Sequence, residues 1–280
     1  MDFNTEKMIK TALCEDMPYG DITSEICVAE KKHADGCFIA NESGILCGTE
    51  ILCRTFNIID SSVTVSLNVK DGEKIRKGEA IAEISGSARA VLAGERTALN
   101  FLQHLSGIAT KTFKAVESVK GFGVSIADTR KTVPGMRMLE KYAVTTGGGI
   151  NHRFGLSDGI LIKDNHIAAA GGIIPAVKAA KRRAPHTLKI EVETSCIKEV
   201  EEALEAGADI IMLDNMTATR MYEAVKIIGR RAVTEASGCI DEKSLLAAAK
   251  TGVDIISIGA LTHSAPALDI SLKFKVDNNK

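Results

Sequence analysis

Polar side chains with catalytic potential follow a series of short apolar segments in this chain. Each segment has the unbroken apolar character of a parallel strand that is covered on both faces. The six segments end at Asp128-Thr129-Arg130-Lys131, Lys163-Asp164-Asn165-His166, Glu193, Asp214-Asn215, Glu235-Ala236-Ser237-Gly238 and Gly259. Because the strands of an α/β barrel converge at their carboxyl ends, where the active site lies, we expect these residues to be neighbours. Strands also end in ordinary polar loops, so the series, rather than any one residue, supports the prediction.

Cationic side chains are concentrated between positions 130 and 163. They are Arg130, Lys131, His152, Arg153 and Lys163. An arginine fork binds a carboxylate or phosphate through two parallel hydrogen bonds, and a lysine acts as a point charge. The cluster predicts a pocket for a small substrate with several negative charges. A solvated basic loop is the alternative interpretation.

Two carboxylates, Glu193 and Asp214, follow consecutive segments of the series. Paired carboxylates at such a rim suit a Mg²⁺ ion that in turn binds a diphosphate. They could equally be ion-pair partners for Lys163 and Arg153, and the two interpretations are compatible.

Glycines form the third component of the predicted site. Gly147-Gly148-Gly149 precede His152, while Ser237-Gly238 and Gly259 follow predicted strands. Glycine at a strand end lets backbone N–H groups approach a phosphate, and the N-terminus of the next helix adds a favourable dipole. A phosphate site is therefore expected late in the barrel.

The spacing of apolar residues predicts the elements that would position these groups. Strands are expected over 124–127, 159–162, 190–192, 210–213, 232–234 and 255–258, and helices over 172–184, 196–206, 217–230 and 241–251. Alternating strands and helices are typical of a parallel sheet or barrel.

The first hundred residues have a different pattern. Helices are expected over 5–15 and 92–118, the second with a break near Ser106-Gly107, and short strands over 37–40, 44–47, 62–69 and 80–84. The stretch 71–84 looks like the hairpins of a lipoyl or biotinyl carrier, but it has no lysine in a carrier-type turn. It therefore indicates a structural sheet.

Composition excludes several classes of function. The 280 residues carry 35 Lys+Arg against 36 Asp+Glu, and Trp is absent, which argues against nucleic-acid binding. No apolar run reaches the length of about 20 residues that a membrane helix needs. The seven cysteines are odd in number and form no C-x-x-C pair, so a reducing, cytoplasmic location is expected.

The sequence resembles the quinolinate phosphoribosyltransferase family. The resemblance is densest over 127–167, ADTRKTVPGMRMLEKYAVTTGGGINHRFGLSDGILIKDNHI. Further matches keep the family's order and spacing over nearly the whole chain: GDITS (20–24), ERTALNFLQHLSGIAT (95–110), EVET (191–194), IIMLDNMT (210–217), EASGCI (235–240) and GVDIISIGALTHSAPALDISL (252–272).

The resemblance implies a fold and an assembly. It implies an α/β protein with an N-terminal α/β sandwich domain, residues 1–108, joined by the C-terminal tail 266–280. An open α/β barrel of the type II phosphoribosyltransferase kind would occupy 109–265. It also implies a homodimer in which the N-terminal domain of one subunit helps to close the site of the other.

The resemblance further implies an activity, the decarboxylating transfer of phosphoribose from phosphoribosyl pyrophosphate to quinolinate, giving nicotinate mononucleotide, diphosphate and CO₂ for NAD biosynthesis. Lys131, Lys163, Glu193 and Asp214 would be the catalytic residues, with Glu193 and Asp214 also holding the ribose hydroxyls and Mg²⁺. Arg130, Lys131, His152, Arg153 and Lys163 would bind the substrate carboxylates and phosphates. Ser237, Gly238 and Gly259 would bind the 5′-phosphate, and Arg96 would reach the quinolinate of the neighbouring subunit.

Two positions depart from the family pattern: Cys239 replaces the usual glycine after Ser237-Gly238, and Thr145 stands where arginine is common. Three other functions remain open. A paralogue of the same fold is associated with molybdate transport. An aldolase could use Lys163 as a Schiff base, although that requires a lysine in an apolar pocket. A non-catalytic protein could bind anionic metabolites.

Overall fold

The computed structural model describes the backbone of residues 3–275 and separates the chain into two compact units. The first unit comprises residues 1–111 and 265–280, and the second comprises 112–264. The family resemblance implies divisions after 108 and after 265, within three residues of those observed. The last part of the predicted tail, 276–280, lies outside the described residues.

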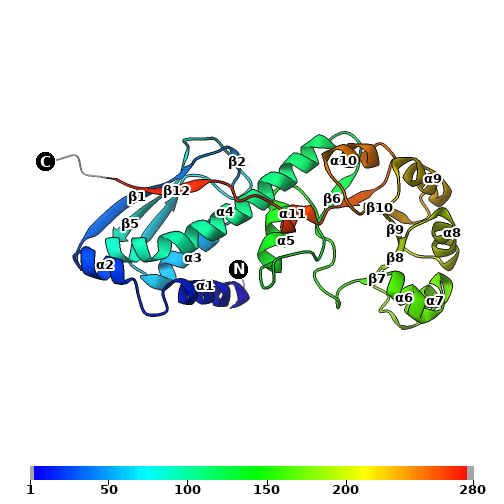
Figure 1. Ribbon diagram of the computed structural model, residues 1–280, viewed down its shortest axis with the longest axis horizontal. Coiled ribbons are helices and arrows are strands. Elements are labelled where there is room, and N and C mark those ends of the chain that lie inside the picture. Colours follow the sequence, from blue (N-terminus) through cyan, green and yellow to red (C-terminus); the bar gives the residue numbers. More distant parts are fainter. Residues whose placement is uncertain (1–2, 276–280) are drawn as a thin grey trace. The chain divides into compact units, whose positions relative to one another are not determined.

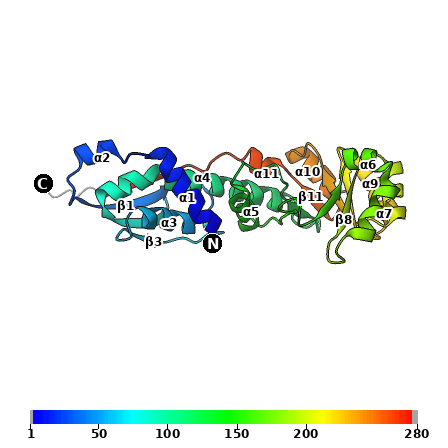
Figure 2. The same ribbon diagram turned by 90° about the horizontal axis from the view of Figure 1, so that it is seen from below.

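The first unit is built on an antiparallel sheet with the strand order β12-β1-β5-β3 (Figures 1 and 2). Its strands are β1 (His33–Ala40), β3 (Thr64–Leu67), β5 (Ala80–Ser87) and β12 (Ile270–Phe274), and a separate pair joins β2 (Gly44–Ile45) to β4 (Lys74–Ile75). Its helices are α1 (Phe3–Asp16), α2 (Ile22–Cys27), α3 (Thr49–Ile59) and most of α4 (Ala88–Ser118). The C-terminal segment therefore joins this sheet as β12, beside β1.

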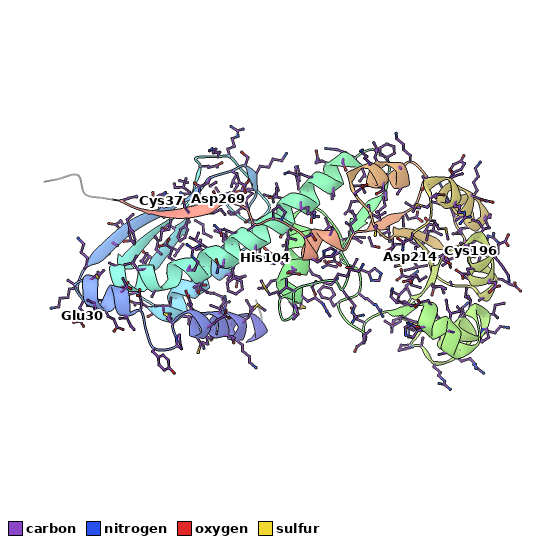
Figure 3. The ribbon with its side chains drawn as sticks, viewed as in Figure 1. Glu30, Cys37, His104, Cys196, Asp214 and Asp269 are labelled. Carbon is purple, nitrogen blue, oxygen red and sulfur yellow. The ribbon has the colours of Figure 1, made fainter. Side chains whose placement is uncertain are left out.

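An apolar core fixes the first unit. Along β1 the buried positions alternate, so that Phe38 and Ala40 face the core. Phe38 meets Phe56 of α3 with ring centroids 6.1 Å apart. Asp269, labelled in Figure 3 just before β12, accepts a hydrogen bond from Asn41 Nδ2 at 3.1 Å. This bond ties the C-terminal strand to the end of β1.

Helix α4 runs without interruption through Ser106-Gly107, so the predicted break is wrong. Ser106 is fully buried, and its hydroxyl accepts a hydrogen bond from the backbone N–H of Cys47 at 3.0 Å. A Cβ at Gly107 would collide with the backbone of Pro266. The serine and glycine therefore serve close tertiary contacts of the helix rather than ending it.

The second unit contains a six-stranded parallel sheet with the order β6-β11-β10-β9-β8-β7. The strands are β6 (Ser125–Ala127), β7 (Ile160–Ile162), β8 (Ile190–Thr194), β9 (Ile210–Asp214), β10 (Val233–Ser237) and β11 (Ile255–Ser257). Figure 1 shows α7 (Ile173–Arg183), α8 (Ile197–Ala206), α9 (Ala218–Ile228) and α10 (Glu242–Ala249) on the outer side of this curved sheet. These helices and strands confirm the βα pattern that the sequence predicts.

The barrel is open, because its end strands β6 and β7 are not paired with each other. On the free side of β6, one isolated bridge joins Ala127 to Ile150. Three short helices of this unit were not predicted: α5 (Arg137–Thr146), α6 (Asp164–Ala170) and α11 (Ala260–His263). Helices α6 and α11 begin within three residues of the ends of β7 and β11, whereas α5 begins ten residues after β6.

None of the helices within residues 3–275 combines the length and the apolar character that crossing a membrane requires. None of the seven cysteines, all of which lie within the described residues, forms a disulfide.

Candidate active site

A cavity of about 470 Å³ lies at the carboxyl ends of the barrel strands. That volume is in the range of small-molecule sites. Ten of the predicted site residues line it: Arg130, Lys131, His152, Arg153, Lys163, Glu193, Asp214, Ser237, Gly238 and Gly259. The folding of successive strands thus brings together side chains that are up to 129 positions apart (130 to 259). We call this cavity the rim pocket.

Four cations of the rim pocket come from three separate segments. Arg130 and Lys131 follow β6, Arg153 follows the bridge at Ile150, and Lys163 follows β7. Burial and, to a smaller extent, the nearby charge of Arg130 lower the pKa of Arg153. The Nε of Arg130 is buried and has no hydrogen-bond partner among the described residues. Such a donor is ready to bind an anion.

Lys163 and Glu193, which both line the rim pocket, form an ion pair. Asp214, labelled in Figure 3, ends β9 and accepts a hydrogen bond from Asn215 Nδ2 at 2.8 Å. The interpretation of Glu193 as a partner of Lys163 is thereby confirmed, whereas Asp214 has a different partner. With four cations against these two carboxylates, the pocket retains an excess of positive charge.

Gly238 is required where β10 reaches the pocket, and Gly259 is in close contact with a lysine side chain. Gly238 has a φ of +127°, and a Cβ there would overlap the side-chain amide of Asn215. A Cβ at Gly259 would lie 2.8 Å from Cδ of Lys131. These glycines allow the lysine and the Asn215 loop to approach the strand ends. The run Gly147–Gly149 does not line the rim pocket, which contradicts the prediction for it; Gly149 instead packs closely against Val144, Thr112 and the Ile126 carbonyl.

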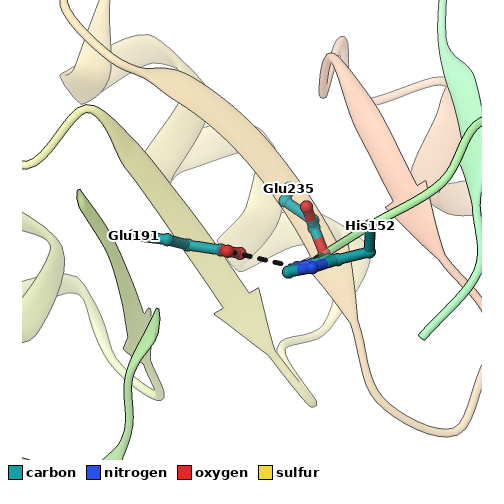
Figure 4. Close-up of side chains that lie close together, drawn as sticks. All are labelled: His152, Glu191 and Glu235. Carbon is teal, nitrogen blue, oxygen red and sulfur yellow. Dashed lines mark ion pairs between the residues drawn. The ribbon is translucent and has the colours of Figure 1, made fainter. Parts of the chain in front are cut away.

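His152, which lines the rim pocket, is hydrogen-bonded to the buried carboxylate of Glu191 (Figure 4). Its Nε2 lies 3.1 Å from Glu191 Oε2 and 3.6 Å from Glu235 Oε1. The Nδ1 atom accepts a hydrogen bond of 2.7 Å from the backbone N–H of Arg153. Because Nδ1 accepts, Nε2 carries the ring proton and donates it to Glu191. The imidazole is therefore fixed in one tautomer and one orientation.

Glu235 lies beside Glu191 and is itself buried. Burial and the neighbouring charge of Glu191 together raise the pKa of Glu235 to about 7, although His152 opposes the change. Oxygen atoms of both glutamates are buried without hydrogen-bond partners among the described residues. A proton on Glu235 relieves the repulsion between the two carboxylates.

The ligand atoms of His152, Glu191 and Glu235 lie within 4.8 Å of one another, a spacing that would suit a metal ion. A metal bound at Nε2 would need the lone pair of that atom. The hydrogen bond at Nδ1 places the ring proton on Nε2 instead. We therefore interpret the cluster as a hydrogen-bonded network.

The comparisons with known proteins agree with this arrangement. Residues 21–106 match the N-terminal domain of quinolinate phosphoribosyl transferase, and residues 108–273 match its C-terminal domain. The chain belongs to the quinolinate phosphoribosyl transferase family. A protein of Bacillus subtilis named "Probable nicotinate-nucleotide pyrophosphorylase (carboxylating)" is 46% identical over 98% of this chain and 94% of its own length. The chloroplastic nicotinate-nucleotide pyrophosphorylase (carboxylating) of Arabidopsis thaliana is 40% identical over 98% of this chain and 84% of its own length.

A solved structure extends the similarity to three dimensions. The nicotinate-nucleotide pyrophosphorylase from Francisella tularensis superimposes with a TM-score of 0.93 at 41% identity, covering 97% of this chain and 96% of that one. The expected family fold, a sandwich-like N-terminal domain with an open barrel, is thereby confirmed.

Arg96, like the run Gly147–Gly149, was predicted to belong to the site of this family member but does not line the rim pocket. It is exposed on α4, in the first unit. Its predicted role in a second subunit stays a prediction.

No role was predicted from the sequence for Glu191 or for the buried pair Asp128 and Lys141. A signal for Glu191 existed, because side chains two apart on a strand share a face and Glu193 was already expected in the site. Glu235 stands in the same relation to Ser237. A charge inside an otherwise apolar parallel strand is unusual and marks a barrel interior with polar contents.

Proposed function

We propose that this chain is a decarboxylating quinolinate phosphoribosyltransferase. It would convert quinolinate and phosphoribosyl pyrophosphate to nicotinate mononucleotide, diphosphate and CO₂ in NAD biosynthesis. The observation that supports this most strongly is the rim pocket itself, in which four cations, two carboxylates and a glycine-lined strand end share one cavity. A dicarboxylate and a phosphorylated sugar together carry the charges that such a pocket would bind.

The roles of the residues follow from charge and position. Arg130 and Arg153 would hold the two carboxylates of quinolinate, because guanidinium forks bind carboxylates with two parallel hydrogen bonds. Backbone groups at Ser237, Gly238 and Gly259 would hold the 5′-phosphate of the sugar, near the start of α11. His152 keeps both ring nitrogens in internal contacts, so we expect it to shape the pocket floor beside Arg153.

Mg²⁺ is part of the proposal, with Glu193 and Asp214 as its protein ligands. Both are oxygen donors in the same pocket, and each uses one oxygen in the described contacts, Oε2 toward Lys163 and Oδ2 toward Asn215. Mg²⁺ is commonly bound by one or two carboxylates together with substrate phosphates, so these residues fit it. When bound, the ion would neutralise charge on the diphosphate leaving group.

The chain's own residues would position the reaction. The pyridine nitrogen forms a bond to the anomeric carbon of the sugar as the bond from that carbon to diphosphate breaks. Glu193 and Asp214 can stabilise the positive charge that develops on the sugar, and Lys131 and Lys163 can stabilise the phosphates and carboxylates. The alkylated ring then accepts electrons as the adjacent carboxylate leaves as CO₂, and a proton takes its place on the ring carbon.

An assay with quinolinate, phosphoribosyl pyrophosphate and Mg²⁺ tests the proposal, with nicotinate mononucleotide and CO₂ measured together. We expect both products in equal amounts, and little product when chelator removes the metal. Nicotinate in place of quinolinate should react poorly, because it lacks one of the two carboxylates. Tight binding of both substrates without any product would instead indicate a non-catalytic binding protein.

A Schiff-base aldolase using Lys163 is disfavoured by the structure. The lysine is paired with Glu193, and its side chain is 44% exposed, whereas such a reaction needs a desolvated lysine. Borohydride treatment in the presence of aldehyde or ketone substrates should leave the mass of the protein unchanged.

We also propose a homodimer with shared sites, in which Arg96 of one copy reaches the quinolinate of the other. Its exposure on α4 and its position outside the rim pocket support this role. Mixing two inactive variants, Arg96→Ala and Lys163→Met, should restore about a quarter of wild-type activity, because one site of each mixed dimer is intact. No restoration would contradict the shared site. A cytoplasmic location stays a prediction from the cysteine pattern.

A further inference from the structure

A lysine without exposed surface lies inside the second unit. Lys141, on α5, and Asp128, which follows β6, form an ion pair in which both side chains are 0% exposed. Burial raises the pKa of Asp128 and lowers the pKa of Lys141, and the opposite charge of each partner works against the change. A buried ion pair of this kind often stabilises a protein no better than apolar side chains of similar volume. Its presence here calls for another explanation.

The ion pair holds the backbone of His152 from both sides. The N–H of His152 donates to Asp128 Oδ1 at 2.9 Å, and its carbonyl oxygen accepts from Lys141 Nζ at 2.8 Å. Asn151, with its amide oriented to donate, reaches Asp128 Oδ2 at 2.6 Å and the Lys141 carbonyl at 3.0 Å. Two consecutive residues just before Arg153 are thus fixed by one pair of charges.

This segment lacks the support that a closed barrel would give it. One isolated bridge, Ala127 to Ile150, joins it to β6, and β7 at the other end of the sheet pairs with β8. In a closed barrel, a strand ladder on each side would fix such a segment. Across the opening the described contacts are made by side chains, including Arg153 Nη1 to the Gly159 carbonyl at 3.0 Å.

We propose that Asp128 and Lys141 are positioning residues that replace the missing ladder and fix His152 and Arg153 relative to Arg130. Asp128 stands two residues before Arg130, so the same carboxylate holds both arginine-bearing segments. Neither residue lines the rim pocket. They act by orienting the side chains of Arg130 and Arg153, which do line it. The inference rests on the proposed function, since it concerns how that site receives quinolinate.

The double variant Asp128→Asn/Lys141→Met tests the proposal. It removes both charges, keeps a side-chain oxygen for the His152 N–H, and removes the donor to the His152 carbonyl. We expect a folded protein whose kcat/KM for quinolinate is reduced about 100-fold, because a displacement of about 1 Å can have that effect. The KM for phosphoribosyl pyrophosphate should change much less, since its phosphate site lies on other strands.

Ile228→Ala provides the control for a loss of stability alone. Ile228 is fully buried on α9, outside the rim pocket, so its truncation should lower the melting temperature and leave both KM values unchanged. A folded double variant with wild-type kcat/KM for quinolinate would overturn the proposal. An equal rise in the KM for quinolinate and the KM for phosphoribosyl pyrophosphate would also overturn it, because it would indicate a general structural role.

Hydrogen exchange on the wild-type chain provides a test that needs neither a variant nor activity. The amide of His152 should exchange as slowly as amides of β8 and β9, although it lies at an open edge of the barrel. Exchange as fast as in the exposed residues 156–158 would overturn the proposal even if the protein is active. If the wild-type chain makes no product, the proposed function fails, while this measurement still decides whether the ion pair fixes the segment.

Discussion

The two units fill their interiors with different kinds of side chain. In the first unit the buried polar residues among those described are serines and threonines, and the core cluster is apolar. In the second unit Asp128, Glu140, Lys141, Glu191 and Glu235 are all buried. Burying a charge is unfavourable unless it is paired and hydrogen-bonded, so charges collect where binding or chemistry needs them. The contrast separates a unit whose core serves stability from a unit whose interior serves a site.

Removing one of the four cations of the rim pocket should reduce activity more than the other substitutions described below. Arg153→Ala should lower kcat/KM for quinolinate by about 1000-fold, since two hydrogen bonds to a charged group are lost. Steady-state kinetics would measure it. Arg153→Lys should restore only part of the activity, because an ammonium cannot form the two parallel bonds. A loss below tenfold would show that this arginine does not hold the substrate.

A substitution that creates a cavity in the core of the first unit should lower stability and leave the rim pocket intact. Phe56 is fully buried, and Phe56→Ala should lower the free energy of unfolding by about 3–5 kcal/mol. Denaturant unfolding followed by hydrogen exchange would locate the loss. We expect faster exchange in β1 and β5 with unchanged exchange in β8 and β9. Leu67→Ala on β3, where Leu67 is 42% exposed, is the matched control and should cost far less.

The buried charges of the second unit should make its stability depend on pH. The pKa of Glu235 is raised from 4.5 to about 7, so the native state binds a proton that the unfolded state has released between these values. Stability should therefore fall as pH rises through this window. Glu235→Gln should remove a decline on the order of 2–3 kcal/mol, which makes the variant the more stable protein at pH 8.

Thermal unfolding at pH 5 and pH 8 would measure this difference. Glu201→Gln, an exposed position on α8, should leave the pH dependence unchanged. Identical slopes for the wild type and Glu235→Gln would show that Glu235 ionises normally.

The smallest effect should come from Cys239. Its backbone N–H donates to Asn215 Oδ1 at 3.3 Å, and its exposed side chain borders the rim pocket. Because phosphate binding there would use backbone groups, Cys239→Ala should change kcat/KM less than about twofold. Phosphoribosyl pyrophosphate should slow alkylation of the wild-type thiol, as mass spectrometry would show. Equal labelling with and without it would place the thiol away from that ligand.

Much of the second unit could be predicted because its local pattern and its fold agree. Unbroken apolar runs such as 210–213 become strands, and the polar residues that follow them meet at one rim. The prediction failed where the residue type is required by a close contact with another part of the fold. Ser106 and Gly107 suggested a break in α4, yet they make close contacts within the first unit. Gly147–Gly149 suggested a phosphate loop, yet Gly149 serves close packing behind α5.

The amino-acid sequence by itself determined which groups are available, where the strands end, and to which family the chain is similar. Only the tertiary structure decided which charges are paired: Lys163 with Glu193, Lys141 with Asp128, and His152 with Glu191. The physical reason is that strand ends follow from local periodicity, whereas an ion pair depends on distances between segments far apart in the chain. Those distances are set by sheet order, by the opening between β6 and β7, and by what each side chain finds when water is excluded.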